Sequence, residues 1–326
     1  MPTLEEEVRA GSRVLSLFVN PLNVRVLRAY ADGPKRLSEV RQAVGWSAES
    51  TVRTAIANLS DLGAVERAAP AGPSRGAMAT ITPAGEELLR VADALQVWLH
   101  GFPARPLPLG SEEAKSAVKA LAGGWSSALV RELATRPTTL GELNARLLGI
   151  SYPSLERRLN WMLVTGQIEP VESEGRGVPY RPTEWLLRAI GPLTAAGRCE
   201  RRHMSVESPL VTDLEVEAAL LLFLPLAPLP HNAEGICQLA VQTDLKANLL
   251  GEPELAGVTV EVRRGEIVTS TPGVSPHPPS WIVSSVDGWL DAVLDGRLEG
   301  LRAGGGNLQL AIDLVAGLHL ALSVER

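Results

Sequence analysis

The feature that most constrains how this chain can fold is an internal repeat. The segment LSEVRQAVGWSAESTVRTAIANLSDLGAVE, residues 37–66, returns as LGELNARLLGISYPSLERRLNWMLVTGQIE, residues 140–169. Each aligned position of the second segment lies 103 residues after its partner, as Leu140 does after Leu37, and no gap interrupts the alignment. Chance similarity is a poor explanation, so the sequence predicts two tandem copies of one folding unit.

The first copy predicts three helices. The segment NVRVLRAYAD is followed by RLSEVRQAVG, in which Ser38 is placed to cap the helix and Gly45 to end it. A third segment spaces its apolar residues at intervals of four, three and three, at Val52, Ile56, Leu59 and Leu62. Because its opposite face carries hydrogen-bonding side chains, the second and third helices match a helix-turn-helix pattern.

A β-hairpin, or wing, is predicted after the third helix of each copy. Its strands are AVERAA and MATITP in the first copy, and QIEPVES and VPYRPT in the second. Arg75 and Arg176 stand near the two tips. The second wing is two residues shorter, because Thr183 follows Thr82 by 101 positions rather than 103.

Residues 14–99 and 116–203 resemble winged helix-turn-helix transcription regulators of the HxlR and MarR type. The marks are a Leu-x-Glu-Leu helix, a Thr/Ser-Leu-x-x-Arg-Leu recognition helix and a Thr-Pro-x-Gly after the wing. The recognition-helix pattern is matched by Thr51, Val52 and Ile56 in the first copy and by Ser154, Leu155, Arg158 and Leu159 in the second. Ala55 stands where the arginine is expected, and Glu184-Trp185-Leu186 replaces the second Pro-x-Gly.

The resemblance implies that the chain binds double-stranded DNA, with arginines placed for phosphate and base-edge contacts. Each copy is an imperfect match to the family pattern, so whether both copies bind DNA stays open. The candidate DNA-binding residues are Arg36, Ser50, Thr51, Arg53, Thr54, Arg75, Ser151, Tyr152, Ser154, Arg157, Arg158 and Arg176. Such regulators usually act as homodimers whose recognition helices enter successive major grooves. The repeat is therefore interpreted as a dimer fused into one chain, and whether this chain forms a further homodimer stays open.

A protein-docking scaffold is the alternative interpretation, since the winged-helix fold alone does not confer DNA binding. The exposed arginines can equally be ordinary surface residues that contact only water. The charge distribution favours different partners for different parts of the chain, because residues 1–204 carry a net charge of +4 and residues 205–326 a net charge of −10.

The C-terminal third begins near Pro209 and predicts an α+β layer. An apolar helix, DLEVEAALLLFLPL, precedes four strands, ICQLAVQT, GVTVEVRRG, EIVTSTP and SWIVSS, and two helices, VDGWLDAVLDGRLEGL and NLQLAIDLVAGLHLALS. The predicted class is therefore α+β, with winged helix-turn-helix domains at residues 14–104 and 112–204 and an α+β domain at residues 209–326.

Residues 235–324 are similar to the sterol-carrier-protein-like fold. The matching residues are Ser285, Trp289, Gly296, Leu301, Gly304 and Gly305. That family encloses an apolar tunnel for lipid-like molecules, so the resemblance implies a small apolar effector as ligand. The candidate lining residues are Phe223, Trp281, Trp289, Leu294, Leu310, Leu314 and Leu318. Each would serve equally as ordinary core, and a lipid-like carrier is a further alternative.

The sequence gives little support for a secreted protein, a membrane protein, a metalloprotein or an enzyme. The acidic N-terminus is unlike a signal peptide, and the richest apolar run, ALLLFLPLAPLP, is shorter than the roughly 20 residues of a membrane-spanning helix. Cys199 and Cys237 form no CxxC pair and are interpreted as structural thiols. With scattered histidines and no HExxH or GxSxG motif, we expect a cytoplasmic protein that is not an enzyme and has no metal or cofactor.

The sequence hypothesis is accordingly a ligand-responsive regulator, in which two winged helices bind the operator and the C-terminal domain binds the effector. Release of repression by the effector is the expected sign of regulation.

Overall fold

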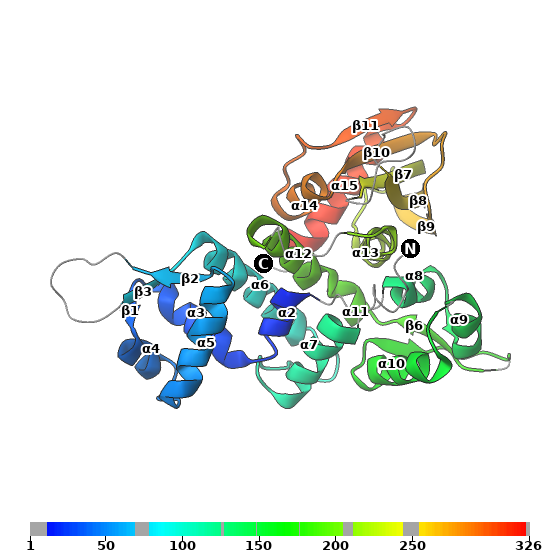
Figure 1. The fold of residues 1–326 in the computed structure, drawn as a ribbon. Helices are drawn as coiled ribbons and strands as arrows, with labels where there is room; N and C mark the ends of the chain where they lie inside the picture. The colour runs from blue at the N-terminus through cyan, green and yellow to red at the C-terminus, as the bar shows by residue number, and fades with distance from the viewer. Residues whose placement is uncertain are drawn as a thin grey trace. The chain divides into compact units, whose positions relative to one another are not determined.

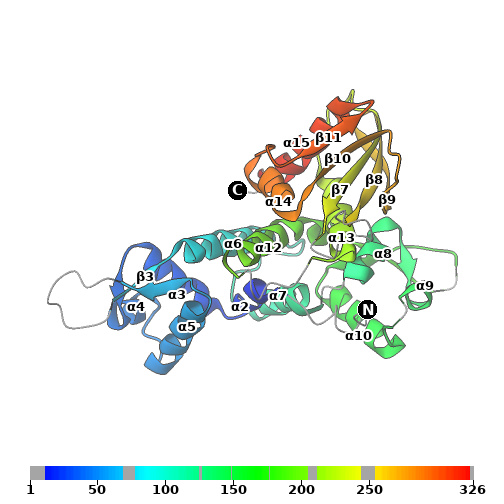
Figure 2. The ribbon, with the colours of Figure 1, turned by 45° about the horizontal axis from the view of Figure 1, so that its top comes forward.

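A computed structural model gives the fold of the chain (Figures 1 and 2). It describes residues 12–68, 78–124, 127–147, 149–175, 177–204, 211–243 and 254–323. The structure is mixed α+β and divides into two compact units. The units comprise residues 12–123 with 195–208, and residues 124–194 with 209–326.

The first unit contains the first copy of the repeat. Its elements are α2 (Arg13–Leu17), α3 (Pro21–Ala31), β1 (Lys35–Arg36), α4 (Leu37–Ala43), α5 (Glu49–Asp61), β2 (Val65–Arg67), β3 (Met78–Ile81), α6 (Pro83–His100) and α7 (Glu112–Gly124). The strands form an antiparallel sheet in the order β1-β3-β2, in which Lys35 pairs with Ala79 and Val65 with Ile81. Helix α3 packs against α4, α5 and α6.

The second copy repeats this order in the other unit. Its elements are α8 (Ser127–Thr135), β4 (Thr138–Thr139), α9 (Leu140–Arg146), α10 (Tyr152–Val164), β5 (Ile168–Pro170), β6 (Pro179–Pro182) and α11 (Glu184–Arg188), followed by α12 (Ile190–His203). The sheet order β4-β6-β5 matches that of the first copy. The first copy comprises α3 to α6, and the second copy comprises α8 to α11.

One threonine in each copy holds the wing to the helix that follows it. The hydroxyl of Thr82 donates to the carbonyl of Gly63 at 2.6 Å and accepts from the backbone N–H of Gly85 at 3.2 Å. The hydroxyl of Thr183 is 2.9 Å from the carbonyl of Gly166 and accepts from the N–H of Leu186 at 3.2 Å. Each threonine is thus the N-cap of its helix, although the residues that follow differ.

The C-terminal part of the second unit is a five-stranded sheet with helices on one face. Its elements are α13 (Asp213–Phe223), the 3-10 turn η1 (Leu224–Leu226), β7 (Gly235–Gln242), β8 (Leu255–Arg263), β9 (Glu266–Pro272), β10 (Ser280–Ser285), α14 (Val286–Asp295), β11 (Arg302–Gly305) and α15 (Leu308–Ser323). The strand order is β11-β10-β7-β8-β9, and only the β7–β10 pair is parallel.

The core of this sheet follows from strand alternation. In β8, Val258, Val260 and Val262 are buried, and they join the same cluster as Leu310 and Leu314 of α15. Side chains at every second strand position point to one face, so the helices cover that face. The four expected strands and three expected helices of this part are all present.

The structure corrects the sequence interpretation at three kinds of position. Helix α4 begins at Leu37, so Ser38 lies inside the helix, and the carboxylate of Glu39 accepts from the N–H of Arg36 at 2.6 Å. Helix α14 ends at Asp295 because Gly296 adopts a left-handed conformation with φ 69°. The short strands β1, β4 and β11 were not expected from the sequence.

Candidate nucleic-acid interface

Helix α5 presents the candidates of the first copy on its outer side. Val52, Ala55 and Leu59 are buried beneath the helix. The candidates Ser50, Thr51, Arg53 and Thr54 are all exposed, as the spacing predicts. Buried Ala55 stands on the inner face, so the absence of an arginine there removes no outward-facing cation.

The charge of Arg53 is tied to its own helix. Its guanidinium donates to Oε1 of Glu49 from Nε at 3.0 Å and from Nη2 at 2.7 Å. Nη1 of Arg41 lies 3.1 Å from the other oxygen of the same carboxylate. The hydrogen bond from Arg53 lowers the pKa of Glu49, with its charge and that of Arg41 acting in the same direction. The carboxylate thus offsets much of the cationic character of this surface.

Helix α10 places the candidates of the second copy differently. Ser151, Tyr152 and Arg157 are exposed, and Ser154 is half-buried. Arg158 is also half-buried, and its Nη1 atom is buried with no hydrogen-bond partner among the described residues. Burial, followed by repulsion from Arg157, lowers the pKa of Arg158. Arg158 therefore lies at the inner edge of the helix rather than on the outward face.

The outer faces of α5 and α10 differ at every equivalent position. Where α5 carries Thr54, Ala57, Asn58 and Asp61, α10 carries Arg157, Asn160, Trp161 and Val164. All eight residues are exposed. The face of α5 is therefore polar and ends in an acid, whereas that of α10 combines a cation, an amide and apolar side chains.

The remaining cationic candidates belong to the wing sheets. Arg36 of β1 is exposed next to the start of α4. Arg75 and Arg176, expected at the wing tips, lie outside the described residues.

Sequence reasoning missed Trp46, in the turn between α4 and α5. Its side chain is 67% exposed, and its backbone has φ 58°, a left-handed conformation that bulky residues rarely adopt. Gly149 stands at the equivalent position of the second copy, with φ 99°. The signal was present in the sequence, because a glycine in one copy marks a turn that the other copy must also make.

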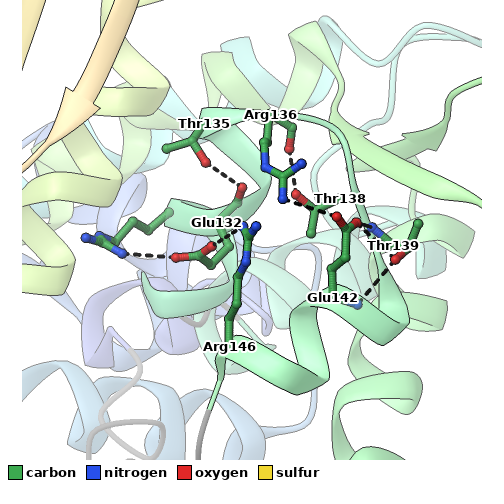
Figure 3. Close-up of polar contacts among 8 residues, drawn as sticks. Glu132, Thr135, Arg136, Thr138, Thr139, Glu142 and Arg146 are labelled. Atoms are coloured by element: carbon green, nitrogen blue, oxygen red, sulfur yellow. Dashed lines mark hydrogen bonds and ion pairs between the residues drawn. The ribbon is translucent and has the colours of Figure 1, made fainter.

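A polar network joins the second copy to α13. The carboxylate of Glu217 on α13 pairs with Nε of Arg131 on α8. Arg131 also contacts Glu132 at 3.0 Å, and Glu132 contacts Arg146 of α9 at 3.1 Å. Figure 3 shows the Glu132–Arg146 pair bridging the two helices. Because the Glu132 and Glu217 side chains are only 16% and 10% exposed, these ion pairs are largely shielded from water.

A second cluster fixes the start of α9 in the same view. Glu142 accepts from the N–H of Thr139 at 2.9 Å, and Thr139 accepts from the N–H of Glu142 at 3.2 Å, which is a reciprocal capping box. Arg136 contacts Glu142 at 3.1 Å (Figure 3). These hydrogen bonds, led by that from the Thr139 backbone, lower the pKa of Glu142.

The equivalent of Arg131 in the first copy is Arg28, which forms an exposed ion pair rather than a shielded one. Arg28 contacts Asp93 of α6 at 3.0 Å, with the two side chains 53% and 66% exposed. The acid that meets Arg28 comes from within the first copy, whereas Glu217, the acid that meets Arg131, comes from the C-terminal part.

The effector candidates are distributed over both faces of the C-terminal sheet. Six of them are buried in the cluster between the sheet and the helices, namely Phe223, Trp289, Leu294, Leu310, Leu314 and Leu318. The indole Nε1 of Trp289 donates to the carbonyl of Ala240 at 2.7 Å, which fixes the ring to β7. Trp281 alternates with buried Ile282 and so faces the other side, next to Gly304 of β11.

The two thiols are both buried and unpaired. Burial raises the pKa of Cys199 and of Cys237 to about 12. A protonated, inaccessible thiol is a poor nucleophile and a poor metal ligand.

The described residues hold neither a candidate metal site nor a candidate membrane-spanning helix. They contain no group of three His, Cys, Asp or Glu side chains placed to hold a metal ion. Within the same residues, no helix has the length and apolar character needed to cross a membrane.

Comparison with known proteins gave no relative: no protein-family model matches the chain, and no curated protein matches it.

Proposed function

We propose that this chain is a DNA-binding transcription regulator that uses its two copies as winged helix-turn-helix domains. The observation that carries the proposal is the exposed outer face of the third helix in both copies, which bears hydrogen-bonding side chains and is followed in each copy by a wing sheet. Helices joined by a short turn can place such a face in the major groove, while cations near the wing sheet meet phosphates. Arg36 of β1 is an exposed cation of this kind.

In this proposal the repeat is a fused dimer that reads one operator. Two-fold dimers bind half-sites about one helical turn apart, and a chain with both copies supplies both halves itself. Because the equivalent faces of α5 and α10 differ in charge and polarity, the preferred operator is an imperfect palindrome.

The C-terminal part is proposed to sense a small apolar effector and to act on the second copy. Helix α13 packs against both α8 and β8, and Glu217 contacts Arg131 within that packing. A change in the sheet that moves α13 therefore also displaces α8. The Glu132–Arg146 ion pair passes this displacement on to α9. An effector can release DNA only if it binds one arrangement better than the other.

The test is binding-site selection from random duplex DNA with the full chain, followed by a titration of the enriched sequence at several salt concentrations. If cations meet phosphates, log affinity should fall linearly with log salt, with a slope of about −0.9 per phosphate contact. The Arg36→Ala variant should have a slope shallower by about one such contact. Failure to enrich any sequence, together with weak and salt-independent binding, would overturn the proposal.

A protein-docking scaffold is the second candidate, because Val164 is 84% exposed and Trp161 37% exposed on the outer face of α10. Exposed apolar side chains next to each other favour contact with another protein. Sedimentation of the wild-type chain and of Val164→Asp without DNA distinguishes the two: a docking role for self-association predicts an oligomer that the substitution dissociates.

A further inference from the structure

The two recognition helices differ in what they offer to a base edge. On α10, Arg157 and Asn160 are both exposed, and neither side chain forms an ion pair or hydrogen bond with any residue that the structure describes. They are three residues apart, so they lie side by side on one face of the helix. Buried Leu155, Leu159 and Met162 fix the opposite face against the domain, so this pair points outward.

Helix α5 offers no such pair. The position equivalent to Arg157 is Thr54, whose hydroxyl donates to the carbonyl of Ser50 at 3.0 Å in its own helix. The position equivalent to Asn160 is Ala57, which has no polar atom to offer. The arginine of this helix, Arg53, is held by two hydrogen bonds to Glu49.

The chemistry of Arg157 and Asn160 selects purines in the major groove. A guanidinium donates two parallel hydrogen bonds to O6 and N7 of guanine. A carboxamide accepts a hydrogen bond from the N6 amino group of adenine through its oxygen and donates one to N7 through its NH2 group. Three residues of helix rise about 4.5 Å, close to the roughly 3.4 Å between stacked bases. Two side chains at this spacing therefore reach neighbouring base pairs.

We propose that α10 is the base-reading helix of this chain, that Arg157 reads a guanine and Asn160 an adenine at the adjacent base pair, and that α5 binds its half-site with weaker base preference. This inference rests on the proposed function, since it requires that the chain bind duplex DNA. It goes further by assigning the sequence preference to one copy and to two side chains.

The experiment is binding-site selection from random duplex DNA with the full chain and four variants, followed by affinity measurements on single-base changes of the enriched site. Arg157→Ala and Asn160→Ala remove the two readers, and Arg157→Lys keeps the charge while removing the planar fork. Arg90→Ala is the matched control, because it removes an exposed arginine of α6 that is not among the candidate DNA-binding residues. Because all three positions are exposed, thermal unfolding should be unchanged, which confirms that each variant is folded.

The wild-type chain should enrich a site with a guanine next to an adenine in one half, and changing either base should weaken binding roughly 5- to 150-fold. Arg157→Ala and Arg157→Lys should lose the preference at the guanine alone, and Asn160→Ala the preference at the adenine alone. Arg90→Ala should enrich the wild-type site.

The outcomes separate this inference from the proposed function. If the wild-type chain enriches no site, the proposed function fails. If it enriches a site and Arg157→Lys keeps full preference while Arg157→Ala weakens all sequences equally, Arg157 contacts phosphate and the inference is overturned. If Arg90→Ala loses the base preference as strongly as Arg157→Ala does, the preference does not depend on the position of Arg157, and the inference is overturned as well.

Discussion

The two copies of the repeat share an order of elements but differ in what completes them. In the first copy, Arg28 meets Asp93 of the same copy in an exposed pair. In the second, the equivalent Arg131 meets Glu217 of α13, in a pair whose acid is largely buried. At this position the first copy supplies the acid itself, whereas the second copy takes the acid from a helix that the repeat does not contain.

The residues after the wing show the same divergence. A Cβ atom at Gly85 would lie 2.2 Å from the carbonyl oxygen of Ala64, so the first copy requires glycine where α6 approaches the sheet. The second copy has Leu186 at this position, fully buried, and Trp185 beside it where the first copy has Ala84. The departure from the Pro-x-Gly pattern therefore exchanges a close backbone approach for large buried side chains.

The largest expected effect is at Trp185. Trp185→Ala should lower the free energy of unfolding by about 3–5 kcal/mol, because it leaves a cavity in the second copy. The matched change Ala84→Gly in the first copy removes only a methyl group and should cost about 1 kcal/mol. Denaturant unfolding of both variants measures the difference, and equal losses would contradict the view that the second copy is built around this indole.

A substitution at Gly85 tests the close backbone approach in the first copy, where there is no room for a side chain. Gly85→Ala should destabilise the first copy by about 1–3 kcal/mol, because the added methyl group meets backbone rather than a flexible side chain. At the equivalent position of the second copy, Leu186→Met should cost less than about 1.5 kcal/mol. Thermal unfolding decides, and a Gly85→Ala variant as stable as the wild type would show that α6 can move away from the sheet.

The two ion pairs give a smaller contrast. Glu217→Gln should cost about 1–3 kcal/mol, since a charged hydrogen bond at a shielded site is lost while Glu132 still faces Arg131. Asp93→Asn should cost less than about 1 kcal/mol, because an exposed pair contributes little. Urea unfolding at low and high salt checks both values, and a larger loss for Asp93→Asn would reverse the comparison.

The smallest effect at neutral pH concerns the two thiols, one in each compact unit. Cys199 and Cys237 should react slowly with a thiol reagent in the native protein at neutral pH, because both are buried with a pKa raised to about 12. A raised folded-state pKa contributes stability that is complete below about pH 9 and is lost as the pH rises toward 12. Unfolding measured from pH 8 to pH 11 should show this decline, which Cys237→Ala should reduce. Rapid labelling of either thiol at neutral pH would show local opening of its unit.

Much of the fold was accessible from the sequence because it depends on local periodicity. The repeat, the helix stripes and the alternating strands of the C-terminal sheet all come from spacings of two to four residues. Two-residue strands such as β1 and β4 carry too few residues to show alternation, and they form because a distant hairpin strand pairs with them. The Glu217–Arg131 pair joins positions 86 residues apart, which no local pattern reveals.

The candidate site was predictable in part. Exposure of Ser50, Thr51 and Thr54 follows from the apolar stripe of α5. Arg158 could have been placed at the inner edge, since it follows buried Leu155 by three positions and precedes buried Met162 by four. The capture of Arg53 by Glu49 was harder to foresee, because the same carboxylate also meets Arg41 of the preceding helix.

The exposed indole of Trp46 gives the first copy a distinct fluorescence signal. Indole fluorescence moves to longer wavelength in polar surroundings, and Trp46 is more exposed than any other tryptophan that the structure describes. Buried Trp98, Trp185 and Trp289 emit from apolar surroundings and contribute a separate, bluer background. The turn that holds Trp46 adjoins α5, so a molecule that covers this helix also screens the ring from water and from a soluble quencher. The protein thus carries its own optical label at the surface where the first copy would meet a partner.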